Sequence, residues 1–346
     1  MRILIDLCHP AHVHFFKYAI RQWQSRGDQV ILTARDKDIT LALLDHYSFT
    51  YSVLSKITPY GRKTHYRFFR EFVLRESRLF KVIRRLKPHV VTAIGGAFIA
   101  PVCTLANVPS VVFTDTEHVF IDRFLTYPLA SLICTPDCFN KKAGPRQVRY
   151  PGLHELAYLH PRRFTPDPEL VRKAGIDPEQ KYCILRFVSW QAHHDIGQQG
   201  FADNLKFTFV QEIARYAVPY ITSEEPLPQE FEPYRLKIPF HHIHHVMAYA
   251  SLCVGEGATM ASESAILGVP AVYINSLRLG YIDMLTDFGL VRQAQSTAYA
   301  LEHCISWLTD PQAKEKYRST LKKMLADKID MTDYIVRTIE KVVDST

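Results

Sequence analysis

The sequence predicts an α/β protein with two domains, each built on a doubly wound parallel sheet. Its 346 residues are too many for one ordinary hydrophobic core and enough for two. Short apolar runs alternate with helical segments along most of the chain, which is typical of parallel strands joined by helices. Hydrophobic residues make up 47% of the chain and charged residues 22%, so the composition is that of a globular protein.

The first half begins with an apolar run at residues 3–7, which suits a buried strand. Helical spacing follows from residue 15, and Gly27 stands where a helix C-cap would. The remaining segments of this half alternate in the same way. In order, we expect a strand at 29–34, a helix at 38–45, a strand at 50–54, one or two helices at 66–86, a strand at 90–94, a helix at 97–106, and strands at 110–114 and 132–135.

Residues 150–168 are rich in proline and polar side chains, so we place the connection between the domains there. A second α/β pattern follows, with strands at 182–187, 219–222, 252–255 and 271–274 and helices at 205–216 and 260–267. The end of the chain is helical and charged. The predicted domains are residues 1–158 and 159–325, with a C-terminal helix at 326–346 that packs back on the first domain.

The sequence also bears on the compartment of the protein. Asp6 interrupts the first apolar run, so the start does not have the pattern of a signal peptide. Residues 89–114 carry no Lys, Arg, Asp or Glu, but glycines and prolines break them up, which favours buried core over a membrane span. Seven scattered cysteines favour reduced thiols. We therefore expect a cytoplasmic protein.

The basic charge is concentrated in one segment. Between residues 56 and 88, eleven Lys and Arg residues accompany only two acidic ones. The net positive charge of this segment is therefore larger than the net charge of +7 of the whole chain. Aromatic residues lie among the cations, which favours contact with an anionic membrane surface. The alternative is a solvated helix face whose aromatic residues enter the core. Nucleic acid is not an expected partner.

The segment from Cys253 to Asn275 has the pattern of a nucleotide-binding turn. Its first strand ends at Gly255, and small residues then open a helix, namely Gly257, Ala258 and Thr259, followed by Met260. The first N–H groups of a helix are unpaired and lie at the positive end of its dipole, which suits a diphosphate. Glu263 lies about one turn further on and can accept two hydrogen bonds from a ribose diol. The alternative is an ordinary strand–turn–helix without a ligand.

This segment resembles the donor-binding motif of GT-B glycosyltransferases, notably the peptidoglycan N-acetylglucosaminyltransferases, and of the non-hydrolysing UDP-N-acetylglucosamine 2-epimerases. The resemblance implies a GT-B fold, in which two Rossmann-like domains face a cleft. It also implies that Glu263 binds the ribose of UDP and that the glycine turn binds its phosphates. Residues 9–17, 186–195 and 241–275 resemble a family of uncharacterised GT-B-like proteins.

The first half shares two further loops with the transferases. Residues 88–101 resemble their second glycine loop, which implies that Gly95 and Gly96 lie on the acceptor side. Residues 115–118 fall at a polar acceptor-side loop and add His118. The first loop departs from the pattern, because histidine, proline and alanine at 9–12 replace its glycines.

Transfer of a sugar requires a base near the acceptor hydroxyl. His12 is the first candidate, because it follows the first strand and matches a histidine of the transferases' first loop; His14 is the second. Asp115 and Glu117 follow another strand end and are candidates for a base or for binding acceptor hydroxyls. The alternative for all four is helix capping or packing.

Further donor-binding candidates follow the first strand of the second domain. These are Arg186, Ser189, Trp190, His193 and His194. In the histidine cluster 241–245, the resemblance places His244 beside the nucleotide base. No paired carboxylate or cysteine accompanies this cluster, so neither a metal nor a cofactor is expected. Asp36 and Asp38 match an Asp-x-Asp motif, but we expect them to cap a helix.

The sequence therefore predicts a metal-independent GT-B glycosyltransferase at the inner face of the cell membrane. It would move a sugar from a UDP-sugar to a lipid-linked or glycan acceptor for cell-surface polysaccharide. A UDP-sugar 2-epimerase and a non-catalytic nucleotide-sugar-binding protein are the alternatives.

Overall fold

The computed structural model describes residues 1–56, 64–187, 203–223 and 226–345. The chain divides into two compact units. Unit 1 comprises Met1–Tyr158 and Ile329–Thr346, and unit 2 comprises Leu159–Lys328. Each unit contains its own parallel sheet with helices on both faces, which confirms the predicted α/β fold class.

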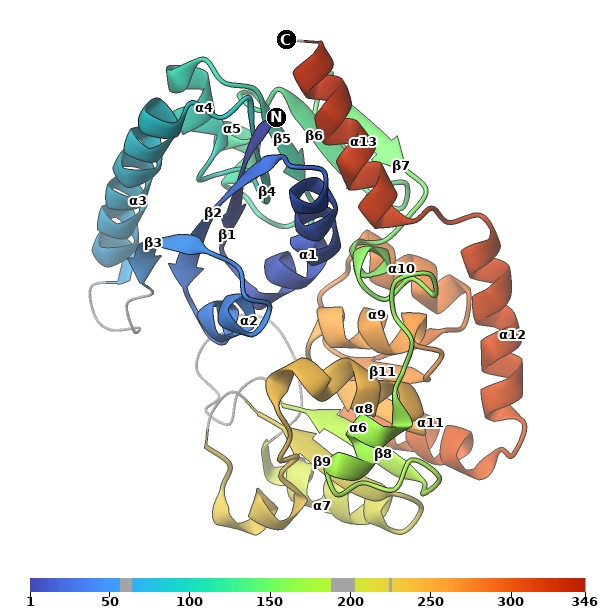
Figure 1. Ribbon diagram of the computed structural model, residues 1–346. Helices are drawn as coiled ribbons and strands as arrows, with labels where there is room; N and C mark the ends of the chain where they lie inside the picture. The colour runs from blue at the N-terminus through green and yellow to red at the C-terminus, as the bar shows by residue number, and fades with distance from the viewer. Residues whose placement is uncertain (57–63, 188–202, 224–225, 346) are drawn as a thin grey trace. The chain divides into compact units, whose positions relative to one another are not determined.

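The sheet of unit 1 has seven parallel strands in the order β3-β2-β1-β4-β5-β6-β7 (Figure 1). Its strands are β1 Arg2–Leu7, β2 Gln29–Asp36, β3 Tyr51–Lys56, β4 Val90–Ile94, β5 Ser110–Phe113, β6 Leu132–Pro136 and β7 Gln147–Tyr150. Most residues of β1, β4 and β5 are buried, as expected for central strands covered on both faces. The order reverses between β1 and β4, and a crevice forms at the carboxyl ends of the strands at such a point.

Helices cover both faces of this sheet. They are α1 Pro10–Ser25, α2 Thr40–His46, α3 Thr64–Leu86, α4 Ala100–Ala106, α5 Asp122–Leu125, the 3-10 helix η1 His154–Ala157, and α13 Met331–Asp344. Helix α3 packs beside α4, whereas α1 packs against α2, η1 and α13 (Figure 1). The last helix of the chain therefore belongs to the first sheet.

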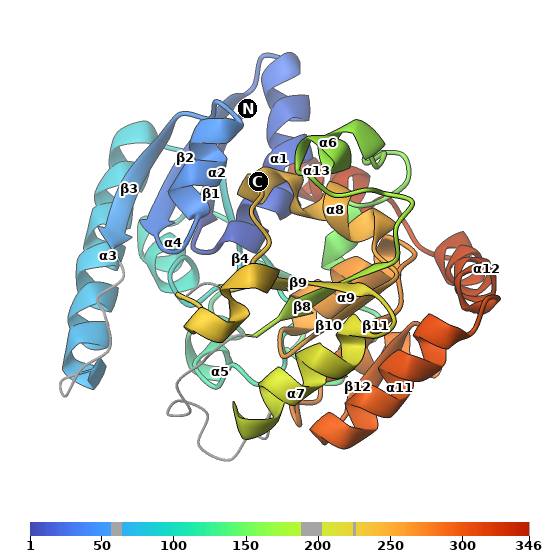
Figure 2. The same ribbon diagram turned by 90° about the horizontal axis from the view of Figure 1, so that it is seen from below.

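The sheet of unit 2 has five parallel strands in the order β12-β11-β10-β8-β9 (Figure 2). They are β8 Tyr182–Arg186, β9 Val218–Thr222, β10 Leu252–Gly255, β11 Ala271–Ile274 and β12 Val291–Ala294. The helices are α6 Pro168–Lys173, α7 Asp203–Ala214, η2 Gln229–Tyr234, η3 Phe240–His242, α8 Ile243–Tyr249, α9 Ala258–Ile266, α10 Gly280–Asp287, α11 Thr297–Thr309 and α12 Ala313–Ala326. One apolar cluster joins the sheet to α7 and α11, and another joins it to α6 and α8.

The structure decides between some local alternatives and corrects other expectations. The segment at 66–86 forms one continuous helix, α3. Strands β7 and β12 are present, although their short, half-polar sequences did not identify them. The prediction that Asp36 and Asp38 cap a helix was wrong, because α2 begins after Ile39 without a side-chain cap. Asp36 instead ends β2, and Asp38 adopts a left-handed φ of 49° in the connecting turn.

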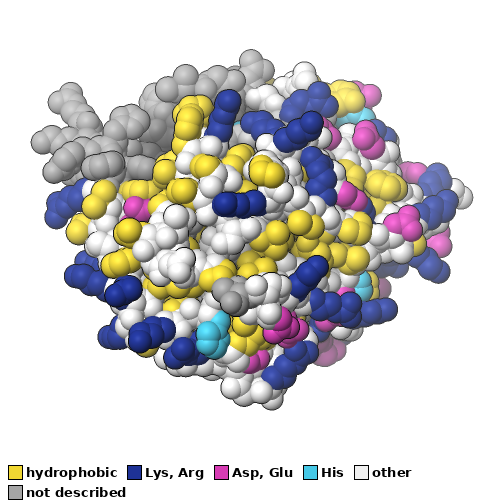
Figure 3. All heavy atoms as spheres, turned by 90° about the horizontal axis from the view of Figure 1, so that it is seen from above, with side chains coloured by type: hydrophobic (Ala, Val, Ile, Leu, Met, Phe, Trp, Pro, Cys, Tyr) yellow, Lys and Arg dark blue, Asp and Glu magenta, His cyan; other side chains and the backbone are white. Residues whose placement is uncertain are grey.

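The basic residues of α3 divide between two environments. Arg75 is fully buried, whereas Arg78, Lys81, Arg84 and Arg85 are exposed. Figure 3 shows a face on which Lys and Arg side chains are spread out with hydrophobic side chains between them. Within the described residues, no helix is both long and apolar enough to cross a membrane.

Candidate functional site

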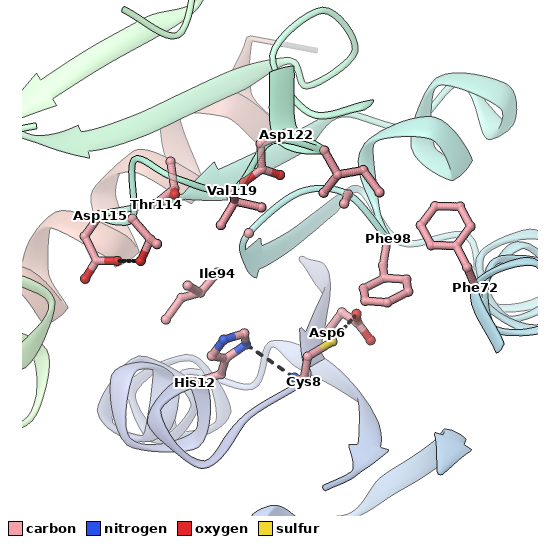
Figure 4. Close-up of a pocket in the computed structure, with 14 residues that line it drawn as sticks. Asp6, Cys8, His12, Phe72, Ile94, Phe98, Thr114, Asp115, Val119 and Asp122 are labelled. Carbon is pink, nitrogen blue, oxygen red and sulfur yellow. Dashed lines mark hydrogen bonds between the residues drawn. The ribbon is translucent and has the colours of Figure 1, made fainter. Parts of the chain in front are cut away.

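A pocket of about 290 Å³ lies in unit 1 at the carboxyl ends of β1, β4 and β5 (Figure 4). The segments after β1 and β5 contribute polar side chains to the cavity, whereas the loop after β4 contributes Gly95, Ala97 and Phe98. The lining residues are Asp6, Cys8, His12, Phe72, Ile94, Gly95, Ala97, Phe98, Thr114, Asp115, Thr116, Val119, Ile121 and Asp122. The pocket thus brings together two of the predicted catalytic residues, His12 and Asp115, from distant parts of the sequence.

His12 lies in the first turn of α1. The backbone N–H of Cys8 donates to His12 Nδ1 at 3.3 Å, which ties the ring to the end of β1. His9 is the residue that caps the helix, since its Nδ1 accepts from the N–H of Ala11. Burial lowers the pKa of His12 well below its usual range, and the neighbouring basic groups His9, His154 and Lys37 lower it further. The imidazole is therefore neutral near pH 7.

Asp115 faces the pocket from the loop after β5 (Figure 4). Its Oδ2 lies 3.0 Å from Nδ1 of His154, and the Thr116 hydroxyl donates to its Oδ1 at 3.0 Å. Burial by itself raises the pKa of a carboxyl group, but His154 and these hydrogen bonds outweigh it, and the net pKa of Asp115 is lowered. Asp115 is therefore an ionised acceptor at the edge of the cavity.

A buried ion pair supports the floor of the pocket. Arg75 reaches from α3 to Asp6 on β1, with its NH2 2.6 Å from Oδ1 and 2.8 Å from Oδ2. Both side chains are at most 1% exposed. The Thr33 hydroxyl also donates to Asp6, and the Phe98 ring lies 5.0 Å from the guanidinium. Burial, followed by Asp6, raises the pKa of the Cys8 thiol, so this sulfur is protonated.

The other residues predicted for the acceptor side are placed differently. Gly95 lines the pocket, but Gly96 lies where a Cβ atom would be 2.2 Å from Thr126 Cγ2. His14 is buried and stacks on the Tyr158 ring at 5.3 Å. Glu117 is buried outside this pocket, where its carboxylate accepts from the Asn140 N–H. His118 is exposed and does not line the pocket.

Three polar groups of the site escaped the sequence reasoning. Asp122 lines the pocket, and burial raises its pKa, although the Thr126 hydroxyl and the Gly96 N–H stabilise the charged form. Asp6 also lines the pocket, and its partner Arg75 and the residue His154 lie behind the lining. No motif marks His154 or the pair Asp6–Arg75, because the paired residues are 39 and 69 positions apart in sequence. Only the strand ends at Leu7 and Phe113 pointed to this edge.

The predicted nucleotide-binding turn lies in unit 2. Strand β10 ends at Gly255, Gly257 is the N-cap of α9, and Ala258, Thr259 and Met260 form its first turn. A Cβ atom on Gly255 would lie 2.7 Å from the carbonyl oxygen of Arg186, so close strand packing requires this glycine. A Cβ atom on Gly257 would meet nothing within 4 Å. The space in front of the α9 N-terminus is thus open at Gly257.

Glu263 and His244 form a pair behind this turn. His244 Nε2 lies 2.9 Å from Glu263 Oε1, and their side chains are 5% and 12% exposed. His244 comes from the first turn of α8, and its ring also contacts Phe164 edge-on. A buried hydrogen bond between a ring nitrogen and a carboxylate fixes the rotamer of both side chains. Glu263 is therefore held in one orientation, one helical turn from Thr259.

The remaining donor-side candidates are only partly described. Arg186 ends β8 beside Gly255, and its carbonyl oxygen accepts from the Glu256 N–H at 3.3 Å. Ser189, Trp190, His193 and His194 lie outside the described residues. In the histidine cluster, Nδ1 of His245 accepts from the Asp167 N–H. Among the described residues, no group of three or more His, Cys, Asp or Glu side chains has the arrangement of a metal site.

Solved structures of sugar-nucleotide enzymes share the fold of the whole chain. The UDP-GlcNAc 2-epimerase from Neisseria meningitidis matches with a TM-score of 0.67 at 13% identity, covering 99% of this chain and 100% of that one. MurG from Acinetobacter baumannii matches with a TM-score of 0.60 at 14% identity, covering 99% and 100%. The kitacinnamycin glycotransferase matches with a TM-score of 0.65 at 13% identity, covering 99% of each chain. At these identities the likeness shows the GT-B fold.

Sequence comparison identifies nearer relatives. The uncharacterized protein MJ0665 of Methanocaldococcus jannaschii is 26% identical over 282 residues, which are 78% of this chain and 80% of that protein. A family model described as "Protein of unknown function (DUF354)" matches residues 1–339. The chain, with its GT-B fold, therefore belongs to the DUF354 family.

Proposed function

We propose that this protein is a glycosyltransferase that uses a nucleotide-diphosphate sugar, with UDP as the nucleotide. Unit 2 binds the donor, and unit 1 binds a glycan or lipid-linked acceptor for cell-surface polysaccharide. The observation that carries the proposal is the turn between β10 and α9, where an open helix N-terminus and a fixed carboxylate lie one helical turn apart.

The donor half of the proposal follows from the chemistry of UDP. The N–H groups at the start of α9 and the Thr259 hydroxyl are donors for the diphosphate, and the exposed position of Thr259 leaves that hydroxyl accessible. The ribose diol offers two O–H donors, and the carboxylate of Glu263 is a bidentate acceptor held by His244. Arg186, at the end of the adjacent β8, contributes positive charge near this turn. The site requires no metal and no cofactor, since the helix terminus and Arg186 offset the phosphate charge.

The acceptor half follows from the pocket of unit 1. An acceptor sugar presents hydroxyl groups, and the cavity offers a neutral imidazole at His12 and ionised oxygens at Asp115. The imidazole is suited to hold a hydroxyl by a hydrogen bond, and the carboxylate is suited to receive its proton. Gly95 leaves the adjacent backbone accessible to the ligand. A site for an acceptor hydroxyl distinguishes the proposed transferase from a protein that only binds a nucleotide sugar.

A membrane-linked acceptor is favoured by the outward side chains of α3. The exposed cations Arg78, Lys81, Arg84 and Arg85 accompany Val73 and Leu74, which are 47% and 43% exposed. Each cation near an anionic bilayer contributes about 1 kcal/mol. We therefore propose that the protein works in the cytoplasm at the inner face of the membrane, with this surface in contact with lipid.

Binding of UDP to a Glu263→Ala variant tests the donor site. Loss of the ribose acceptor is expected to weaken UDP binding about tenfold to a hundredfold, measured by calorimetry on the full chain. Glu256→Ala, whose side chain belongs to the same turn but is not assigned to the ribose, is the matched control. UDP binding that is equally tight in wild type and Glu263→Ala contradicts the proposal.

Incubation with UDP-N-acetylglucosamine alone separates transfer from epimerisation. A transferase leaves the sugar configuration unchanged without an acceptor, whereas a 2-epimerase converts it, which NMR detects directly. Conversion of the sugar configuration in the absence of an acceptor identifies the protein as a 2-epimerase and contradicts the proposed transfer. Tight UDP binding without turnover of any donor and acceptor pair assigns the chain to non-catalytic binding.

A further inference from the structure

The pocket of unit 1 contains a carboxylate paired with a histidine from a distant part of the chain. Asp115 follows β5, whereas His154 begins η1 after β7. His154 Nδ1 lies 3.0 Å from Asp115 Oδ2, and their side chains are only 8% and 17% exposed. Because an ionised carboxylate is an acceptor only, His154 Nδ1 carries the proton in this contact.

The surroundings of the other ring nitrogen of His154 indicate that the contact with Asp115 is the main role of this residue. Nε2 is buried and has no hydrogen-bond partner among the described residues, and the ring packs 4.6 Å from the ring of Phe15. A buried polar atom without a partner costs free energy that an apolar ring would avoid. The contact with Asp115 is the interaction at this position that requires a histidine.

His12 is oriented in a way that limits its chemistry. Its Nδ1 accepts from the backbone N–H of Cys8, so the proton of the neutral ring is on Nε2. A nitrogen that already carries a proton donates a hydrogen bond and has no lone pair to receive another proton. The geometry therefore makes His12 a donor toward the pocket and leaves Asp115 as the acceptor.

We propose that Asp115 is the proton acceptor of this pocket, that His154 is the positioning residue which holds it, and that His12 donates a hydrogen bond through Nε2. This assignment deepens the proposed glycosyl transfer and rests on it for the reaction. The acceptor hydroxyl oxygen bonds to the anomeric carbon, and its proton passes to the Asp115 carboxylate. The bond from that carbon to the diphosphate oxygen breaks, and the electron pair leaves on the diphosphate.

The surroundings of Asp115 allow its titration to be identified. His12 from α1, His154 from η1 and Tyr150 from β7 are the titratable groups that interact with it. Burial, followed by Asp115, raises the pKa of Tyr150, so that phenol stays neutral. The pKa of Asp122 is raised by burial, whereas that of Asp115 is lowered. Asp115 and Asp122 therefore titrate in different ranges.

Histidine nitrogen NMR on the wild-type chain tests the assigned protons without any substrate. We expect His12 to show a protonated Nε2 and a bare Nδ1, and His154 to show a protonated Nδ1. Substitution of each histidine by glutamine assigns its signals. A proton on Nδ1 of His12, or a bare Nδ1 in His154, would overturn the assignment.

Carboxyl carbon NMR of Asp115, assigned by its absence in Asp115→Asn, tests the role of His154. His154→Phe keeps the ring and removes the donor, so the pKa of Asp115 should rise by about one unit or more. His154→Asn keeps an N–H at the position of Nδ1, so the pKa should stay near the wild-type value. An unchanged pKa in His154→Phe contradicts the proposal. His154→Gln, which also lacks that donor, serves if the phenylalanine variant does not fold.

The reaction itself tests the acceptor. Asp115→Asn should reduce transfer about a hundredfold to ten-thousandfold. His12→Gln keeps an N–H near Nε2 and should lose about tenfold or less; loss equal to that of Asp115→Asn would make His12 the base. In His154→Phe the acidic limb of the pH profile should move to higher pH. If the wild type transfers no sugar, the proposed function fails. The NMR results still show whether His154 donates to Asp115.

Discussion

Two glycines show how differently single residues contribute to the sites. A Cβ atom at position 96 would lie 2.2 Å from Thr126 Cγ2 and 2.9 Å from Val112 Cγ2, whereas one at position 257 meets nothing within 4 Å. Sequence resemblance assigned both glycines to ligand binding. The structure shows that Gly96 is required by packing and that Gly257 lies in open space.

Gly96→Ala should therefore destabilise unit 1 by about 1–3 kcal/mol, because Thr126 and Val112 must move. Gly257→Ala should change stability by less than about 1 kcal/mol and should weaken UDP binding, because the methyl group occupies the space of the ligand. Denaturant unfolding and UDP titration of both variants check this pair. Equal stability of the two variants contradicts the packing argument.

His244 should matter for UDP binding although it need not touch the nucleotide. His244→Phe removes the partner that fixes Glu263, and we expect UDP binding to weaken about tenfold, since a charge-assisted hydrogen bond is lost. His244→Gln keeps an amide near the position of Nε2 and should bind more tightly than His244→Phe. Calorimetry on both variants measures the difference in UDP affinity. Equal affinities of the two variants would show that the hydrogen bond of His244 does not support UDP binding.

At the scale of elements, α3 illustrates what amphipathic patterning predicts and what it misses. The segment was correctly predicted to be helical, and the helix buries Leu79 and Ile83. It did not predict that Arg75, in the middle of the basic segment, is the buried partner of Asp6. A count of charged residues in the sequence does not distinguish one cation from another. The burial of each cation depends on which strand of the sheet its side chain packs against.

Glu76 gives α3 a measurable pH dependence. Burial raises the pKa of this carboxyl to about 7, and its Oε1 has no hydrogen-bond partner among the described residues. The folded state thus favours the neutral form, so the stabilisation is complete below the unfolded pKa and is lost as pH rises through the folded value.

Glu76→Gln should consequently raise the free energy of unfolding by about 1–2 kcal/mol near pH 8 and change it little near pH 4. Urea unfolding at both values checks the sign. Glu71→Gln is the control: Glu71 is ion-paired with Arg35 at 2.7 Å, so its substitution should destabilise the protein near pH 8. Equal effects of the two substitutions near pH 8 contradict the assignment.

At the scale of the whole molecule, the chain completes its first unit only at its end. Helix α13 packs on α1 and η1, and buries Met331, Ile335, Val336 and Ile339. The Thr332 hydroxyl donates to the carbonyl oxygen of Ala157 at 2.7 Å. The stability of unit 1 therefore depends on residues that follow unit 2 in the sequence.

Truncation after Lys328 should destabilise unit 1 selectively, because the apolar side chains of four buried residues contribute about 1.5–3 kcal/mol each. Hydrogen exchange should show loss of protection in α1 and unchanged protection in β8 and β10. Truncation after Asp344, which removes the exposed Ser345 and a last residue outside the described ones, is the control. Uniform loss of protection in both units would show that they unfold together.

The sequence by itself determined the parallel α/β architecture and the turn at Gly255–Glu263, because both depend on local periodicity and on residues within one strand and helix. It also located the strand ends from which His12 and Asp115 extend. Only the tertiary structure decided the partners of these residues. His154 with Asp115, Arg75 with Asp6, and His244 with Glu263 meet across 39, 69 and 19 positions of sequence. Such pairs arise from the order of strands and the packing of helices, and no local pattern records which distant side chain will share a buried site.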